Sequence, residues 1–206
     1  MSNAGHLRGL SRNQISIIIG VVCALPMAWL FWAAVHDLLG ANPAEALIRQ
    51  SGIWTLRFVC VVLAVTPLRI MMGWTALAQW RRQLGLTVFI YALLHFLSYA
   101  WLDMGFEIED IAKDIVKRPF IWMGFSAFAL MSLLAITSFN RAIRWLSAKR
   151  WRRLHQCIYV IAGLALLHFL WMRAGKNNFA EVALYAVIIS ALLLCRVYRH
   201  FKKNLN

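Results

Sequence analysis

The sequence predicts an all-α polytopic integral membrane protein, a single bundle of six transmembrane helices with both termini in the cytoplasm. Three observations predict this class. Apolar residues make up 62% of the 206 residues and charged residues only 15%, whereas a soluble domain is about a quarter charged. The apolar residues gather in six runs, each near the ~20 residues that span a bilayer. Lys and Arg gather between alternate runs, which predicts the orientation.

The predicted spans are joined by short connections, so neighbouring helices should pack antiparallel in one domain, residues 1–206. Pro26 lies inside the first span and predicts a kink. Thr66-Pro67 marks the end of the second span, and Pro119 suits the first turn of the fourth. The spans are about 14–35, 53–70, 83–102, 119–138, 153–173 and 179–198.

The distribution of charge orients this bundle. All eight acidic residues fall on the side opposite the N-terminus, most of them in the loop 103–118. This loop is either a solvated face or a docking surface for a soluble partner outside. The net charge of +14 is therefore a signal of membrane topology and gives no indication of nucleic-acid binding. The basic residues on the N-terminal side are Arg8, Arg12, Arg69, Arg81, Arg82, Arg141, Arg144, Lys149, Arg150, Arg152, Arg153, Arg196, Arg199, Lys202 and Lys203.

The cysteines argue against several kinds of metal site. Cys23, Cys60, Cys157 and Cys195 are dispersed through the apolar runs, and neither CxxC nor CxxCH occurs. This spacing does not fit zinc, an iron–sulfur cluster or covalently attached c-type haem. We interpret all four as small buried apolar side chains.

Three histidines lie within predicted spans, where ionisable side chains are costly and are functional candidates. His95 is thirteen residues beyond Arg82, and His168 is fifteen beyond Arg153, each arginine being the last inner one of its span. Two residues amount to about 3 Å of rise, so both imidazoles should lie at one depth in the outer half. Such a pair on two helices can ligate a haem iron from both faces. Interhelical hydrogen bonding without a cofactor is the alternative.

His155 is predicted to belong to a second site. It lies only two residues beyond Arg153, near the inner surface, and the third span offers Gln83 or Leu84 at that depth instead of a histidine. A second haem there would need another axial ligand, such as water or a basic side chain, and a flavin or a quinone is the alternative. On a straight helix the thirteen residues between His155 and His168 make about 3.6 turns, so the two point in different directions.

Other polar and small residues favour an interior pocket. In lipid, a polar stripe on the third span should face the bundle interior. Gly124, Gly163 and Ser126 would let a macrocycle approach a backbone, although they equally suit ordinary helix packing. The stripe consists of Thr87, Tyr91, His95, Ser98 and Tyr99.

Two arginines are candidates to bind the carboxylates of a haem. Arg57 is expected about one turn inside the outer end of the second span, and Arg173 at the outer end of the fifth. Guanidinium groups suit haem propionates. Snorkelling toward lipid head groups is the alternative for both.

Several stretches, taken as a set, resemble the MsrQ family of haem-binding membrane subunits of bacterial periplasmic methionine sulfoxide reductase systems. The resemblance covers essentially the whole chain. A more distant similarity connects it with the transmembrane domains of ferric reductases and NADPH oxidases. The stretches are LGANPAEAL (39–47), VTPLR (65–69), RRQLGL (81–86), LHFLSYA (94–100), KRPFIWMG (117–124), TSFNRAIRWLSAKRWRRLHQCIYV (137–160) and LHFLW (167–171).

This resemblance implies a function. His95, His155 and His168 match the family's haem ligands, and family members bind one or two b-type haems and are associated with FMN. They sit in the bacterial inner membrane and pass electrons from a cytoplasmic flavin reductase or from quinol to a periplasmic molybdopterin subunit. That partner reduces methionine sulfoxide in oxidised periplasmic proteins. The chain would therefore be an electron-transfer subunit, with no catalytic residue of its own.

Departures from the oxidases and two rival functions stay open. Compared with the oxidases, the chain lacks a fourth histidine and C-terminal flavin and nucleotide domains, so electrons are expected to arrive from another molecule. The first rival is a self-sufficient ferric or oxygen reductase that discharges electrons at the outer face. The second is a non-redox transporter or scaffold in which the histidines relay protons or pack.

Overall fold

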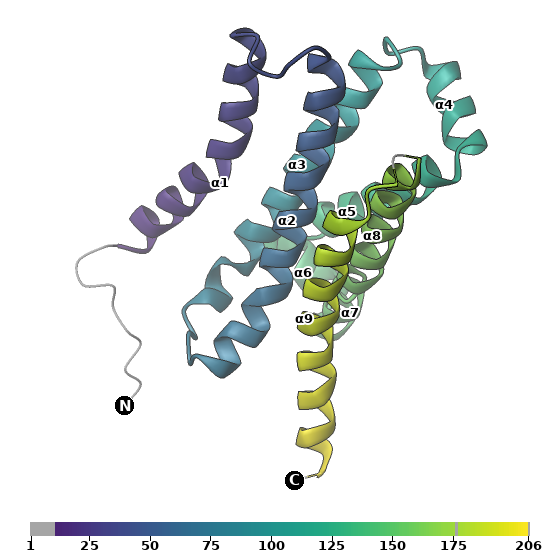
Figure 1. The fold of residues 1–206 in the computed structure, drawn as a ribbon. Coiled ribbons are helices and arrows are strands. Elements are labelled where there is room, and N and C mark those ends of the chain that lie inside the picture. Colours follow the sequence, from purple (N-terminus) through teal and green to yellow (C-terminus); the bar gives the residue numbers. More distant parts are fainter. Residues whose placement is uncertain (1–10, 176, 206) are drawn as a thin grey trace.

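The computed structural model describes residues 11–175 and 177–205, with the side chains of 199–205 outside the description. Arg8 and the side chains of Arg199, Lys202 and Lys203, counted above among the inner basic residues, therefore lie outside it. The described part is helical and has no strand. Its helices are α1 (Arg12–Val35), α2 (Pro43–Met71), α3 (Leu77–Leu102), α4 (Ile108–Lys117), α5 (Pro119–Ile136), α6 (Asn140–Leu146), α7 (Ala148–His155), α8 (Ile158–Ala174) and α9 (Ala180–Leu205) (Figure 1).

The predicted all-α bundle with six membrane-spanning segments is confirmed. Within the described residues, six helical segments are long and apolar enough to cross a membrane, and α7 and α8 together form one of them, Ala148–Ala174. Many large apolar side chains on the outer helices are exposed, including Val35 and Val187. A bundle surrounded by lipid requires such an apolar exterior, because nothing is gained by hiding apolar side chains from hydrocarbon.

The helix that contains the predicted second span begins ten residues before residue 53. Helix α2 begins at Pro43, after Asn42, whose side-chain oxygen accepts a hydrogen bond from the Glu45 backbone N–H at 3.1 Å. Asn at the N-cap followed by Pro at the first helical position is a strong start signal. The polar first turns of α2 are not apolar enough to be recognised from hydropathy, although their capping residues mark them.

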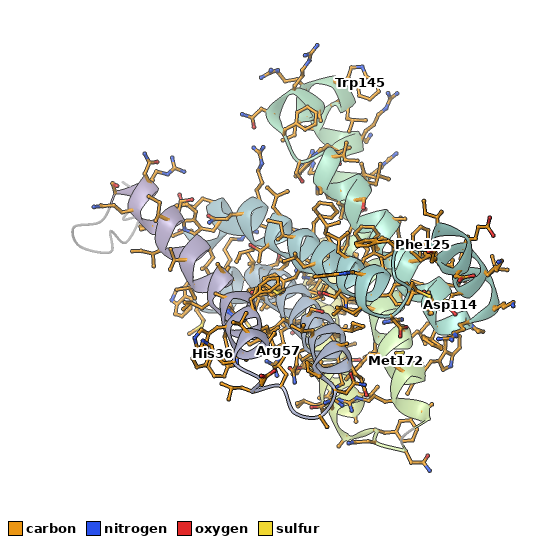
Figure 2. The ribbon with its side chains drawn as sticks, turned by 90° about the horizontal axis from the view of Figure 1, so that it is seen from above. His36, Arg57, Asp114, Phe125, Trp145 and Met172 are labelled. Carbon is orange, nitrogen blue, oxygen red and sulfur yellow. The ribbon has the colours of Figure 1, made fainter. Side chains whose placement is uncertain are left out.

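The other span boundaries extend or divide the predicted segments. Helix α3 begins at Leu77, before the predicted residue 83. The candidate span at Ala180–Tyr198 agrees with the predicted 179–198, and helix α9 continues beyond it to Leu205. Two short helices, α4 and α6, occupy connections that were predicted only as loops. Trp145, near the end of α6, projects away from the bundle (Figure 2) and is 84% exposed.

The predicted single helix 153–173 is also corrected. It breaks after His155, and α8 starts at Ile158. In the break, the backbone N–H of Gln156 donates to Arg153 at 3.1 Å and that of Cys157 to Leu154 at 3.0 Å, which is the tighter three-residue pattern of a 3₁₀ turn. His155 and His168 therefore lie on two separate helices, and the straight-helix estimate of their relative direction does not apply.

Four helices form the core of the bundle. Helix α2 packs on α3, α3 on α5, α5 on α8, and α8 in turn contacts α2, so that α3 and α8 stand at opposite corners. Helix α9 packs on α2 and α8, and α1 lies outside α2 and α3 (Figure 1). The central helix α2 is the best buried. In its apolar stretch 56% of the residues are buried inside the bundle, against 17% for α1.

The two ends of the bundle differ in charge. All eight acidic residues are described, and they lie at the end that carries α4 and the α1–α2 and α8–α9 connections. We name this the acidic end, and the opposite end, with α6, α7 and the α2–α3 connection, the basic end (Figure 1). Helix α1 starts and α9 finishes at the basic end. That the basic end faces the cytoplasm stays a prediction.

Candidate functional site

The structure brings His95 and His168 together inside the bundle. Their ring centroids are 6.2 Å apart and the ring planes meet at 73°. His95 projects from α3 and His168 from α8, the two helices at opposite corners of the four-helix core. Each lies about two turns from the end of its helix that faces the acidic end. The depth match that the arginine spacing predicted is present in the fold.

Backbone and hydroxyl groups of α2 orient the His95 ring. Its Nδ1 lies 2.9 Å from the Ile48 carbonyl oxygen and 3.2 Å from the Ser51 hydroxyl. A carbonyl can only accept, so we assign the proton to Nδ1, which donates to Ile48. The other ring nitrogen, Nε2, is then unprotonated and can bind a metal ion.

The same arrangement holds His168 against α5. Its Nδ1 donates to the Phe120 carbonyl oxygen at 2.6 Å. Phe120 is in the first turn of α5, directly after Pro119, so the carbonyl belongs to a rigid helix start. A hydrogen bond from Nδ1 to a carbonyl is how metal-ligating histidines are usually fixed, since it sets both the tautomer and the ring direction. Both imidazoles therefore present Nε2 as the free ligand atom.

Two glycines make room for the imidazoles. A Cβ atom on Gly124 of α5 would lie 2.8 Å from Nδ1 of His168, and one on Gly52 of α2 would lie 3.0 Å from Cε1 of His95. The helices between the two histidine-bearing corners thus each place a glycine against one ring. Gly124 was among the small residues noted in the sequence, whereas Gly52, Ser51 and the Ile48 carbonyl were not. The Ser-Gly pair within an apolar helix was the available signal. Gly163 has nothing within 4 Å of such a Cβ.

These residues fit a haem iron held by two imidazoles. A bond from a first-row metal ion to an imidazole nitrogen is about 2 Å, and the ring centre lies about 1 Å further, so two rings on one iron have centres about 6 Å apart. The observed 6.2 Å matches this separation. No group of three or more His, Cys, Asp or Glu residues that could hold a metal ion occurs in the described part of the chain. The donor set is therefore a pair, and haem iron needs only two protein ligands.

A polar cluster at the acidic end links α4 to α3, which carries His95, and to the start of α5. The Tyr99 hydroxyl donates to Asp114 Oδ2 at 2.7 Å, and Arg118 Nε donates to Asp114 Oδ1 at 2.8 Å. Asp114 is buried, whereas the other acids of α4 are exposed. Tyr99 lies one turn beyond His95, and Arg118 lies two residues before Phe120. Asp114 therefore holds α4 against α3, one turn beyond His95, and against the start of α5, which carries Phe120.

His155 lies in a different place, at a cavity of about 500 Å³ at the basic end. Its ring stacks on Trp151 with centroids 3.9 Å apart, its Nδ1 lies 3.1 Å from the Trp151 carbonyl oxygen, and its Nε2 lies 3.4 Å from the Ser138 hydroxyl. The cavity is also lined by Arg81, Arg82, Arg152, Tyr159 and Gly85, among others. His155 thus lies apart from His168, and no second histidine lines the cavity among the residues that the structure describes.

The polar stripe of α3 does not line a single pocket. The Tyr91 hydroxyl donates to the Cys23 carbonyl oxygen at 2.6 Å and accepts from the Met27 N–H at 3.2 Å. In a regular helix the Met27 N–H would donate to the Cys23 carbonyl directly. The Tyr91 hydroxyl bridges these two groups instead, and so supports the bend of α1 at Pro26. Thr87 and Ser98 bond to carbonyls of α3 itself, four residues back. Of the stripe, only His95 reaches the paired-histidine site.

The structure gives both candidate arginines other partners. Arg57 Nε donates to the Tyr185 hydroxyl at 3.0 Å, and its guanidinium lies 4.4 Å from the Trp54 ring centre. At about 100° per residue, Arg57 is turned about 140° from Gly52, and it lies on the opposite side of the bundle from Asp114 (Figure 2). Arg173 forms an ion pair with Glu181 and packs on Phe169. Binding of haem propionates by either arginine stays a prediction, which the position of Arg57 does not favour.

Six apolar spans around a core with two facing imidazoles define a class of membrane protein, the ferric-reductase-like transmembrane bundle. The family described as ferric reductase like transmembrane component matches residues 51–167 of the chain. This stretch begins at Ser51, beside His95, and ends next to His168.

Individual relatives narrow the class. The protein from Polaromonas naphthalenivorans named protein-methionine-sulfoxide reductase heme-binding subunit MsrQ is 60% identical over 200 residues, which cover 97% of this chain and 91% of the relative. Proteins of the same name from Herminiimonas arsenicoxydans and Bordetella pertussis are 46% and 44% identical, covering 92% and 98% of this chain and 87% and 97% of the relatives. The chain belongs to the MsrQ family, which confirms the resemblance seen in its motifs.

Proposed function

We propose that the chain is a haem b electron-transfer subunit of a methionine sulfoxide reductase system in the bacterial inner membrane. The observation that carries this proposal is the pair His95 and His168, with ring centroids 6.2 Å apart and each Nδ1 bonded to a carbonyl. A bound haem b would supply one-electron cycling between ferric and ferrous iron. The names of the relatives, which describe a heme-binding subunit, support the same reading.

Different residues would bind the haem iron, orient its ligands and leave room for them. His95 and His168 supply the two ligand nitrogens, and the Ile48 and Phe120 carbonyls make those nitrogens more basic by accepting from Nδ1. Gly52 and Gly124 leave room for the rings. The apolar helices around them exclude water, which lowers the reorganisation that accompanies a change of charge on the iron.

Electrons would enter at the basic end and leave at the acidic end. With the basic end in the cytoplasm, the cavity beside His155 is the second redox site, accessible to a cytoplasmic flavin reductase; quinol from the membrane is the alternative donor. A second haem at His155 would need another axial ligand, which no histidine among the described lining residues provides. The acceptor would be a periplasmic molybdopterin reductase of methionine sulfoxide.

Helix α4 is the surface on which we propose that this acceptor docks. The side chains of Glu109 and Asp110 are 89% and 63% exposed, and Ile108 and Val116 are 81% and 84% exposed. Exposed acids steer a basic partner surface, and exposed apolar side chains provide the anchors of an interface. The buried Asp114 bonds to Tyr99, one turn beyond His95, and so holds this helix near the paired histidines. A partner docked on α4 would therefore lie close to the site from which the electron leaves.

Reoxidation of the purified, reduced protein by its partner reductase tests this function. Stopped-flow absorbance should show rapid reoxidation that requires both the partner and methionine sulfoxide. In the variant E109Q/D110N the second-order rate constant should fall about three- to tenfold at low salt and approach the wild-type value at high salt, because steering by exposed charges is screened. D37N, an acid of the same end on another loop, is the matched control and should react normally.

Two results would turn the assignment toward its rivals. Fast reduction of soluble ferric iron or oxygen without any partner indicates a self-sufficient reductase. Colourless protein after expression with ample haem indicates a non-redox transporter or scaffold.

A further inference from the structure

Helices α6 and α7 form a hairpin that stands apart from the core of the bundle. Helix α6 packs chiefly against α7, and in the view from above it projects sideways from the spans (Figure 2). Polar contacts hold the base of the hairpin: Arg82 donates to the side chain of Asn140 at 2.8 Å, and Trp151 Nε1 donates to the Thr137 carbonyl at 2.9 Å. The hairpin is therefore fixed at its base, whereas its outer face is exposed.

The length of α5 places this hairpin at the membrane surface. Helix α5 has 18 residues, which give about 27 Å of rise, against a hydrocarbon core of about 30 Å. It therefore only just spans, and its end at Ile136 lies at the edge of the hydrocarbon. Helix α6 begins close after it, at Asn140, whereas the α2–α3 connection extends further at the same end (Figure 1). Helix α6 thus lies at the level of the lipid head groups, and its sideways projection carries it over lipid.

One face of α6 combines an indole ring with cations. At about 100° per residue, Arg141, Arg144 and Trp145 share the face opposite to the buried Ala142. All three are exposed, Trp145 by 84%, and Lys149 at the start of α7 is exposed as well. All eight acidic residues lie at the opposite end of the bundle. These cations therefore have no side-chain carboxylate within reach.

This combination matches an anionic lipid surface better than a soluble protein. Tryptophan is enriched at the boundary between head groups and acyl chains, and Lys and Arg close to a membrane are attracted to anionic lipids. Helical segments that carry both kinds of residue on their exposed face lie in the plane of the interface. A soluble partner would instead approach the end of the bundle, where the α2–α3 connection extends beyond the hairpin.

We propose that α6 and the start of α7 form an in-plane anchor for anionic phospholipid, with Trp145 inserted among the head groups and Arg141, Arg144 and Lys149 bound to their phosphates. The anchor bears on the basic-end cavity, because Trp151 belongs to the same hairpin and stacks on His155 with ring centroids 3.9 Å apart. An anionic leaflet would thus hold one wall of that cavity in place. The proposal does not depend on the proposed electron transfer.

Quenching of tryptophan fluorescence by brominated lipids tests this anchor. The full-length, haem-loaded protein is reconstituted into vesicles whose lipids carry bromine next to the head group, and the difference between each protein and the same protein with W145F reports Trp145. In phosphatidylglycerol this emission should be quenched at least about twofold, and clearly less in phosphatidylcholine. The triple variant R141Q/R144Q/K149Q should lower the quenching in phosphatidylglycerol to the phosphatidylcholine level. R12Q, which removes an exposed basic-end arginine of α1, is the matched control and should behave as the wild type.

The haem absorption spectrum is recorded on every sample, so that a misfolded variant or a failure of the proposed function is seen separately. Equal quenching in the two lipids, unchanged by the triple substitution, would overturn the anionic head-group site. So would a Trp145 that neither lipid quenches and that soluble acrylamide quenches fully. Protection of Trp145 from acrylamide only after a soluble flavin reductase is added would overturn the proposal too, and would assign the hairpin to protein docking.

Discussion

Replacing His95 or His168 with alanine is expected to abolish the same haem signal. Each imidazole would supply one of the two protein ligands of an iron held between them, so the loss of either one should remove the state that needs both. Absorption spectra of purified H95A and H168A should both lack the reduced low-spin bands of the wild type. Residual haem in either variant should be five-coordinate and at least about tenfold less tightly held.

Two other histidines separate ligation from general damage. H155A alters the cavity at the basic end and should leave the outer low-spin signal in place. H36A, which removes an interfacial ring whose centroid lies 4.6 Å from that of Trp32 at a tilt of 47°, should retain the full spectrum. If H95A lost the signal while H168A kept it, or the reverse, the two residues would not share one iron.

Substitution of Gly124 by alanine is expected to be nearly as damaging as loss of a ligand. The new Cβ would stand 2.8 Å from Nδ1 of His168, a contact that either displaces the ring from the Phe120 carbonyl or separates α5 from α8. Overpacking of this kind typically costs about 1–3 kcal/mol, and a displaced ligand typically loses about 10- to 100-fold in metal affinity. Haem content per chain and the thermal unfolding midpoint in detergent measure the two effects.

Gly163 provides the matched control for this substitution. It lies in α8, on the same helix as His168, and a Cβ there meets nothing within 4 Å. G163A should therefore keep its haem and unfold at the same temperature or slightly higher, because alanine favours a helix by about 1 kcal/mol over glycine. Gly52, whose added Cβ would lie 3.0 Å from the His95 ring, should give an intermediate loss in G52A. Full haem content in G124A would show that His168 is not held as described.

The spans and the histidine pair could be predicted from the sequence because both depend on properties of single segments, namely the length of an apolar run and the number of residues along one helix. The length of an apolar run reports its ability to cross lipid, and counting residues from Arg82 and Arg153 measures depth along a helix at a fixed rise. That count alone is enough to place His95 and His168 at one level.

What the sequence did not predict depends on contacts between helices or on polar helix ends. The supports of the imidazoles come from α2 and α5, and no count along α3 or α8 indicates which carbonyl, Ile48 or Phe120, will face Nδ1. The first turns of α2 are too polar to register as a span. The break after His155 arises in a stretch whose flanking residues are all compatible with a continuous helix, so hydropathy joined α7 and α8 into one.

The arginines of the basic end show the same difference between what the local sequence displays and what depends on contacts between helices. The basic character of one end was evident from Lys and Arg alone, and it was interpreted as a topology signal. That Arg81, Arg82 and Arg152 converge on one cavity beside His155 depends on how α3, α7 and the start of α8 pack. That these three arginines line one cavity was visible only in the fold.

The most direct test of the paired-histidine account is the spin state of the iron in the purified wild-type protein, measured by electron paramagnetic resonance in the oxidised form and by absorption after reduction. Two imidazole ligands on one haem iron predict a low-spin ferric signal and, on reduction, the sharp bands of a six-coordinate b-type haem. A high-spin, five-coordinate iron, or no Soret band after expression with ample haem, would contradict the pairing of His95 with His168.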